Sequence, residues 1–256
     1  MKMYFILLLL TQNILAKVNF SLDSRVFSNF YKAESSSSQR FMTGGVGVSH
    51  PFFKKKFSLL HRITYQKQLE GAKEGELMDY RLSLTGLNFK ISKLLNLSWT
   101  PRFDFVFDEL RKNIASQWGA GRIIQNLSYG GKESIFSLSL PLIVIKNFHK
   151  FKTNFNGESN SSLLTIFGLS PAIQITDKWR FGIGAYLIAP ISYSKGKKDL
   201  SSFEVSTSYQ VNKNFNLDVL VGTDTFLLND QGLARSFSDY IATSRSLVSI
   251  GARLTF

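Results

Sequence analysis

The sequence predicts an all-β fold: a transmembrane, antiparallel, up-and-down β-barrel of twelve strands. Three observations predict it. Segments of about ten residues alternate between apolar and polar positions, which is the pattern of strands with one apolar face. The connections between these segments alternate between short and long, as in a barrel with turns at one rim and loops at the other. After the first 16 residues, no stretch approaches the run of about 18 apolar residues that a membrane-spanning helix needs.

Twelve segments carry the alternation. We expect strands over residues 20–31, 40–52, 57–67, 78–91, 97–109, 119–129, 135–145, 162–175, 179–193, 202–212, 214–225 and 243–256. The segment 97–109 is the clearest, because its apolar face is almost wholly large and aromatic; that face comprises Leu97, Trp99, Pro101, Phe103, Phe105 and Phe107. The segments 135–145 and 162–175 are apolar on both faces and are the least distinct. Ten or fourteen strands remain alternatives, because one hairpin could be miscounted.

The lengths of the connections support this count. Short connections fall near 53–56, 92–96, 130–134, 176–178 and 213, and long ones near 32–39, 68–77, 110–118, 146–161, 194–201 and 226–242. Twelve strands joined in this way begin and end on the side of the short turns. Aromatic residues on the apolar phase cluster near both ends of the strands, which suits two interfacial girdles as well as ordinary packing.

The last eleven residues repeat the alternation up to the final residue. Val248, Ile250, Leu254 and Phe256 fall on the apolar phase with Ala252, and Arg253 falls between them. This pattern resembles the C-terminal strand of Gram-negative outer-membrane β-barrel proteins of the porin-like kind. The resemblance implies a closed barrel in the bacterial outer membrane, contact with outer-membrane lipid, and recognition of Phe256, Leu254, Ile250 and Val248 by the barrel-assembly machinery. It identifies no subfamily and leaves the activity open.

The first 16 residues have the composition of an export signal. Met1-Lys2 precedes an apolar run from Met3 to Leu10, which is too short to span a bilayer, and Ile14-Leu15-Ala16 is a candidate cleavage site. We therefore expect a cleaved signal peptide at 1–16 and one barrel domain at 17–256. A buried first strand or an uncleaved anchor is the alternative. The chain has no Cys, which excludes a lipoprotein anchor and disulfides.

Arginine and lysine fall in different places. The formal net charge is +13, and most Lys residues occur in connections. This distribution does not indicate a nucleic-acid partner; Lys in the long loops would contact anionic lipopolysaccharide or be solvated. Most Arg and acidic residues share the inward phase of the expected strands. The candidates for lining the lumen are Arg25, Arg62, Arg81, Arg102, Asp104, Asp108, Arg122, Arg180, Glu204, Asp218, Asp224, Arg245 and Arg253, together with Asp23 and Asp79.

Such an interior, nearly balanced in charge, has two interpretations. The planar guanidinium group pairs with carboxylates and tolerates partial desolvation better than an ammonium group. An arginine ladder could line a pore and attract anionic or zwitterionic solutes. The same residues could instead form an ion-pair network that fills the barrel and holds it rigid. A barrel of twelve strands lies between packed and porin-like sizes, so size does not decide.

No catalytic or metal-binding constellation stands out. A hydrolytic site needs a histidine beside a nucleophile or carboxylate on one accessible face. The three histidines do not meet this need: Ser49 and His50 point to opposite faces, His61 falls on the outward phase, and His149 falls in a loop with Lys146, Lys150 and Lys152. Asp104 and Asp108 are about 13 Å apart along a strand, and Arg102 is the expected partner of Asp104. We expect no enzyme, cofactor or metal, and the oligomeric state stays open.

Three classes of protein fit the pattern. The first is a porin-like channel for small hydrophilic, including anionic, solutes. The second is a structural or surface-interaction barrel with a lumen packed by Arg–carboxylate pairs and functional outer loops. In the latter, the loop 146–161 is notable for Phe148, Phe151 and Phe155, which could lie at the interface, constrict the lumen or contact a partner. The third is a soluble barrel with an apolar ligand inside, which requires the two faces of every strand to be reversed.

Overall fold

A computed structural model of the chain describes residues 18–29, 40–52, 56–69, 75–108, 111, 113, 115–130, 134–157, 159–193, 200–226 and 246–256. The strands in this part are β1 (Asn19–Asn29), β2 (Arg40–Phe52), β3 (Phe57–Gln68), β4 (Glu76–Thr85), β5 (Leu87–Lys90), β6 (Leu95–Val106), β7 (Gln117–Tyr129), β8 (Phe136–His149), β9 (Ser161–Gln174), β10 (Trp179–Ser192), β11 (Leu200–Gln210), β12 (Phe215–Phe226) and β13 (Ser246–Thr255). No helix in this described part is long and apolar enough to cross a membrane.

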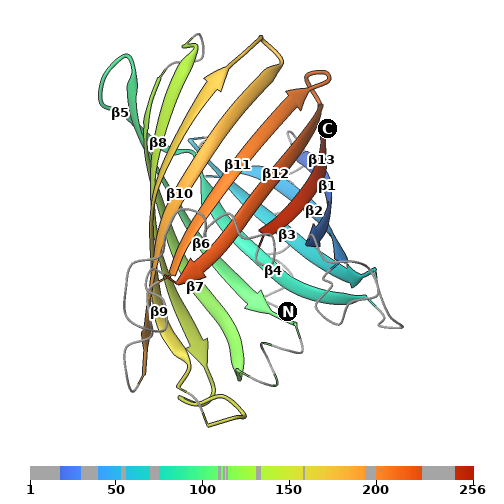
Figure 1. Ribbon diagram of the computed structural model, residues 1–256, viewed down its shortest axis with the longest axis vertical. Helices are drawn as coiled ribbons and strands as arrows, with labels where there is room; N and C mark the ends of the chain where they lie inside the picture. The colour runs from blue at the N-terminus through green and yellow to red at the C-terminus, as the bar shows by residue number, and fades with distance from the viewer. Residues whose placement is uncertain are drawn as a thin grey trace, which may run out of the picture.

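The strands form one closed antiparallel barrel (Figure 1). Except for β4 and β5, strands that follow one another in sequence pair with each other, and β1 pairs with β13 to close the ring. β4 and β5 both pair with β6, so they form one crossing that is interrupted between them. The predicted fold class is therefore confirmed: twelve crossings, with β5 as the one extra strand.

The interruption lies at Gly86, the single residue between β4 and β5. Its φ angle is 93°, a conformation that glycine adopts without steric cost. A Cβ atom there would lie 3.2 Å from the carbonyl oxygen of Lys56 and 3.4 Å from the Cα atom of Phe57. The local break therefore depends on the absence of a side chain.

Replacing Gly86 with alanine should destabilise the barrel by about 2 kcal/mol, because the backbone strain adds to the contact with Lys56. The midpoint of urea unfolding of the refolded barrel, followed by tryptophan fluorescence, measures the effect. Gly44→Ala is the matched control, since a Cβ atom there would meet only the carbonyl oxygen of Asp23 at 3.8 Å. Equal midpoints for the two variants would contradict the prediction.

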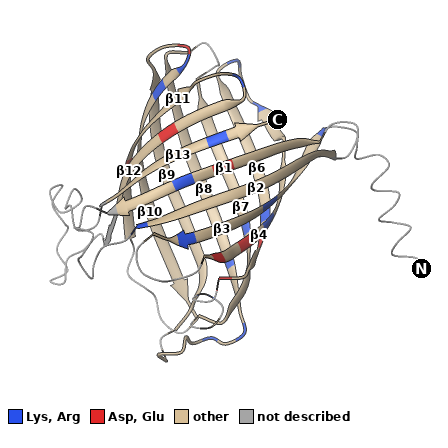
Figure 2. Cartoon of the chain, turned by 90° about the vertical axis from the view of Figure 1, so that its right-hand side faces the viewer, with Lys and Arg blue, Asp and Glu red and all other residues tan. Residues whose placement is uncertain are grey.

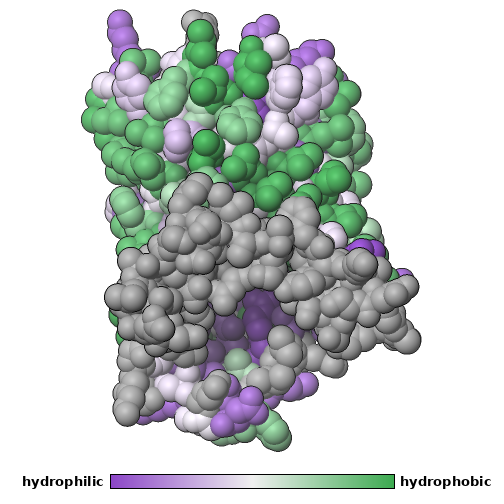
Figure 3. Space-filling view, in the orientation of Figure 1, coloured by the Kyte–Doolittle hydropathy of each residue, from purple (hydrophilic) through white to green (hydrophobic). Residues whose placement is uncertain are grey.

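The two faces of the strands differ as the alternation predicts. On β6, Trp99 and Phe105 are 39% and 40% exposed, whereas Asp104 on the opposite face of the strand is 0% exposed. On β13, Ile250 is 60% exposed and Ser249 is 0% exposed. Figure 3 shows mostly apolar side chains over the upper half of the visible outer surface and hydrophilic residues inside a hollow in the lower half of the view. This distribution is the opposite of a soluble barrel with an apolar interior.

The ends of two strands differ from the expectation. β8 continues to His149 rather than ending at 145, because Asn147 and Phe148 remain paired with Ala120 and Gly119 of β7. The loop expected at 146–161 is shortened accordingly. β6 ends at Val106, and the amides of Phe107 and Asp108 donate to the carbonyl oxygen of Met78. Asp108 therefore lies just beyond the strand on which it was expected.

Several predictions fall outside the described residues. They are the signal peptide at 1–16, Arg245, and the larger part of the long connections at 32–39, 194–201 and 226–242. Asp224 lies in β12, opposite Ser202 in register, and its side chain is likewise outside the described part.

Candidate functional site

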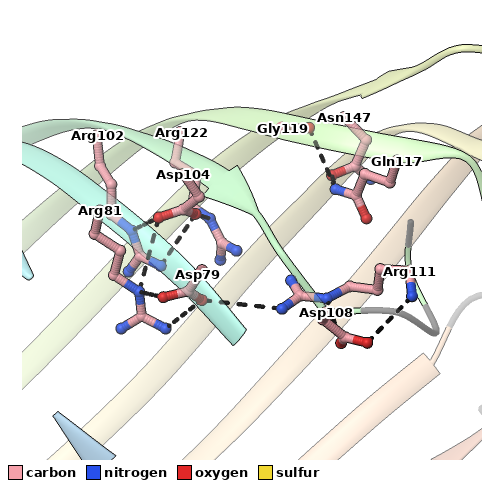
Figure 4. A network of polar contacts seen from close by, with 10 residues as sticks. All are labelled: Asp79, Arg81, Arg102, Asp104, Asp108, Arg111, Gln117, Gly119, Arg122 and Asn147. Carbon is pink, nitrogen blue, oxygen red and sulfur yellow. Dashed lines mark hydrogen bonds and ion pairs between the residues drawn. The ribbon is translucent and has the colours of Figure 1, made fainter. Parts of the chain in front are cut away.

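The centre of the charged interior is Asp104 on β6. In register it lies between Arg81 of β4 and Ala120 of β7. Arg102, two residues earlier on the same face, donates from Nε at 2.5 Å and from Nη2 at 3.0 Å to the two carboxylate oxygens. Arg122 of β7 donates from Nε to Oδ2, and Nε of Arg81 lies 3.8 Å from Oδ1 (Figure 4). One buried carboxylate therefore holds three guanidinium groups together.

This cluster continues toward the long-loop rim. Nε of Arg81 lies 3.1 Å from Oδ1 of Asp79, which is 3% exposed. Arg111 pairs with Asp108 at 2.9 Å, and its Nη2 atom lies 4.0 Å from Oδ2 of Asp79. Figure 4 shows these side chains as a chain of alternating charges from Arg102 to Asp108. Arg111 was missed from the sequence because it lies in a loop, where periodicity assigns no face.

Two further ion pairs lie on the neighbouring strands. Arg62 of β3 donates to Asp23 of β1 at 2.5 Å, and Arg25 of β1 donates to Asp218 of β12. Glycines make room for both: a Cβ atom at Gly45 would lie 2.7 Å from Nη2 of Arg62, and one at Gly251 would lie 2.9 Å from Nε of Arg25. Figure 2 shows basic and acidic positions spaced along the strands of the barrel.

We call this surface the arginine wall. It comprises Arg25, Arg62, Arg81, Arg102 and Arg122 with Asp23, Asp79, Asp104 and Asp218. Each of the ion pairs just described joins strands no more than two places apart in the ring. The charges therefore pair along the wall rather than across the lumen.

A second surface, the hydroxyl wall, lies on the other side. Tyr186 of β10 donates to Oε1 of Glu204 on β11 at 2.7 Å, and its hydroxyl lies 3.1 Å from Oγ of Ser170. With Ser139 and Asn126, which share a hydrogen bond of 2.6 Å, these residues line a recess of about 510 Å³. β10 lies halfway around the ring from β3, which carries Arg62. The interior therefore presents one side rich in ion pairs and another side rich in hydroxyl and amide groups.

The remaining predicted positions lie near the rims. Arg180 donates from Nη2 to Oγ of Ser137 at 2.9 Å and lines the same recess as Glu204. Arg253 is exposed and lies between Asp23 of β1 and Asn216 of β12 in register. Glu204 has the phenol of Tyr186 as its partner. Tyr186 was missed as a lumen residue, although its inward phase on the strand 179–193 was a usable signal.

Comparison with known proteins identifies the architecture. No protein-family model matches the sequence, and no curated protein matches it. Among solved structures, the NanC porin superposes with a TM-score of 0.58 at 11% identity, covering 91% of this chain and 98% of that one. An outer-membrane channel from Pseudomonas putida F1 superposes with a TM-score of 0.61 at 9% identity, covering 93% and 95%.

The chain has the fold of outer-membrane channel barrels.

At these identities the likeness extends to the fold alone. The solute and the roles of the lumen residues are therefore inferred from this chain's own residues.

The histidines of the barrel lie apart from the arginine wall. His50 and His61 stack with ring centroids 5.2 Å apart, and Nδ1 of His61 lies 2.5 Å from the hydroxyl of Tyr80. His61 shares its phase on β3 with Ile63, which is 47% exposed, so it faces outward. Within the described residues, no group of three or more His, Cys, Asp or Glu side chains is placed to hold a metal ion.

His149 is not the loop surface residue that the sequence suggested. It ends β8, with Nδ1 2.7 Å from the carbonyl oxygen of Ala115 and Nε2 3.1 Å from that of Ser161. Asn160 donates to the carbonyl oxygens of both Ala115 and Phe151. These contacts tie the segment before β7 to the base of the loop 150–160.

Replacing Tyr186 with phenylalanine should lower the free energy of unfolding by about 1 kcal/mol, because Glu204 loses its donor. Urea unfolding of the refolded barrel measures this change. Tyr129→Phe is the control, since Tyr129 is 46% exposed on the outer face. A loss of stability in Tyr129→Phe equal to that in Tyr186→Phe would count against a role for the Glu204 contact.

Proposed function

We propose that this protein is a porin-like channel of the bacterial outer membrane that passes small hydrophilic solutes and prefers anions to cations. The fold supports the membrane location, because large apolar side chains such as Phe105, Ile183 and Ile250 are exposed on the outer face and a closed barrel satisfies its backbone hydrogen bonds. The proposal rests chiefly on one observation: the ion pairs of the arginine wall run along the wall. A lumen plugged by charge pairing would instead join strands from opposite sides.

The preference for anions follows from an excess of guanidinium groups. Asp104 is shared by Arg102 and Arg122, with Arg81 also within ion-pair distance. Arg180 and Arg253 are exposed and have no carboxylate partner among the described residues. Fixed positive charge beside a water-filled path raises the local concentration of anions.

Conductance in planar lipid bilayers tests the proposal. We expect the purified, folded protein to form ohmic pores, and a salt gradient to give a reversal potential with the sign of anion selectivity. Heat-denatured protein from the same preparation is the control for contaminating pores. Folded protein that inserts without conducting would refute the channel, and a cation-selective pore would refute the preference for anions.

A structural or surface-interaction barrel is the second candidate. The observation in its favour is that Asp104 is 0% exposed and held by several guanidinium groups, as a rigid scaffold would require. Phe151 and Phe155 at the long-loop rim are 59% and 87% exposed and could contact a partner. This candidate predicts no conductance from correctly folded protein.

A further inference from the structure

Lys146 is a charged residue on the outward face of a membrane-spanning strand. It lies opposite Gly121 of β7 and Leu163 of β9, and its side chain is exposed. Its amino group lies 5.7 Å from the ring centroid of Tyr193, near the long-loop rim. Lysine on the lipid-facing side of a barrel is costly at the bilayer centre and tolerated near the headgroups. Its position therefore suits the layer where lipid headgroups begin.

An apolar groove runs over the barrel wall beside this lysine. It has a volume of about 480 Å³, and its lining includes Leu82, Phe103, Gly121, Ile123 and Val144 as well as Lys146. Gly121 leaves the groove open because it adds no side chain at the outer surface. A Cβ atom there would lie 3.6 Å from the ring of Phe148, an ordinary contact distance.

Aromatic rings connect this groove to a second lysine. Phe148 stacks on Phe103 and on Trp118, with ring centroids 5.9 Å and 5.2 Å apart. Trp118 also lines a hollow of about 610 Å³ with Lys150 and Phe155. The amino group of Lys150 lies 5.3 Å from the ring centroid of Phe151. Among the described residues, neither Lys146 nor Lys150 has a carboxylate partner, so both ammonium groups can bind an external anion.

We propose that this outer face of β7 and β8 binds a phosphorylated, acylated lipid of the outer leaflet, of the lipopolysaccharide class. An acyl chain lies in the groove over Gly121, and phosphate groups contact Lys146 and Lys150. The groove and the two lysines together require one molecule that carries both acyl chains and phosphate groups. Free phosphate would leave the groove empty, and a neutral lipid would leave the lysines unpaired. The inference rests on the outer-membrane location proposed above, but not on conductance.

Titration of the purified full chain in detergent with bis-phosphorylated lipid A, followed by native mass spectrometry, tests the site. Lys146→Gln with Lys150→Gln should weaken binding roughly 30-fold, about fivefold for each lysine near an anionic surface. The double variant should bind dephosphorylated lipid A as the unaltered protein does. Gly121→Leu should weaken binding of both lipids, because its side chain fills the groove.

Lys178→Gln with Lys213→Gln is the control, because these exposed lysines lie in turns at the opposite rim. If the control and the Lys146/Lys150 variant lost lipid A binding equally, net charge alone would explain the loss. That result would overturn the proposed site. Unchanged binding in the Lys146/Lys150 variant would overturn it too. Full displacement of lipid A by millimolar inorganic phosphate would show an anion site that makes no use of the acyl chain. Conductance in bilayers without lipid A, measured in parallel, separates failure of this site from failure of the channel.

Discussion

Replacing Asp104 with asparagine should destabilise the barrel by about 3 kcal/mol, because it leaves guanidinium groups close together without their shared carboxylate. Asp104 is fully buried against the wall, so water cannot readily reach the guanidinium groups to compensate for the lost carboxylate charge. The same change should raise the preference of the pore for anions, since it removes one negative charge from the lumen. The urea midpoint of the refolded barrel and the reversal potential in bilayers measure the two effects.

Asp177→Asn provides the matched control, because Asp177 is an exposed aspartate in a short turn. It should leave both the midpoint and the selectivity nearly unchanged. An Asp104→Asn barrel with the stability of the unaltered protein would mean that the guanidinium groups do not depend on Asp104. A shift toward cations would contradict the account of the wall as a source of positive potential.

Replacing Arg102 and Arg122 together with glutamine should lower the ratio of anion to cation permeability roughly 16-fold. A unit charge about 10 Å from an ion in water contributes about 0.4 kcal/mol, which favours an anion about twofold and disfavours a cation about twofold, so each arginine removed changes the ratio about fourfold. With both removed, Asp104 keeps only the distant contact with Arg81, so the wall becomes locally negative. A salt-gradient measurement of the reversal potential records the ratio.

The control for this pair is again Lys178→Gln with Lys213→Gln, which removes the same charge from a rim instead of the lumen. Its effect should be smaller than that of the arginine pair at physiological ionic strength, because exposed charges are screened. Equal shifts for the two double variants would show that net charge alone sets the selectivity. Because the two arginine replacements also release Asp104, their folded fraction is measured before any comparison of conductance.

The alternation of residues along a strand was enough to predict which side of the wall a charge occupies. A period of two places Arg102 and Asp104 on one face and Phe103 and Phe105 on the other, whatever the neighbouring strands are. The same reasoning identified Arg102 as a partner of Asp104. The convergence of Arg81 and Arg122 on the same carboxylate depends on how β4, β6 and β7 align, and alignment between strands is set by turns and bulges far from these residues.

The outer end of β8 shows why the loops were harder to predict. Lys146 and Asn147 are weak strand formers and read as the start of a loop. In the structure, Asn147 accepts a hydrogen bond of 3.0 Å from Gln117, and Phe148 stacks on Trp118. Both partners belong to β7, so the strand is extended by contacts that no local pattern reveals. The same holds for His149, whose two ring nitrogens lie close to the carbonyl oxygens of Ala115 and Ser161.

The pairing of β1 with β13 has a consequence for how the molecule is made. Ser21 lies opposite Thr255 and Arg25 opposite Gly251, so the seam joins the two ends of the chain. This is the contact of greatest sequence separation in the barrel, and such contacts form late and slowly. Until β13 arrives, the backbone donors and acceptors along β1 stay open, which hydrocarbon does not permit. Closure in a membrane therefore requires that β13 reach β1 before the unpaired edge of β1 is surrounded by hydrocarbon.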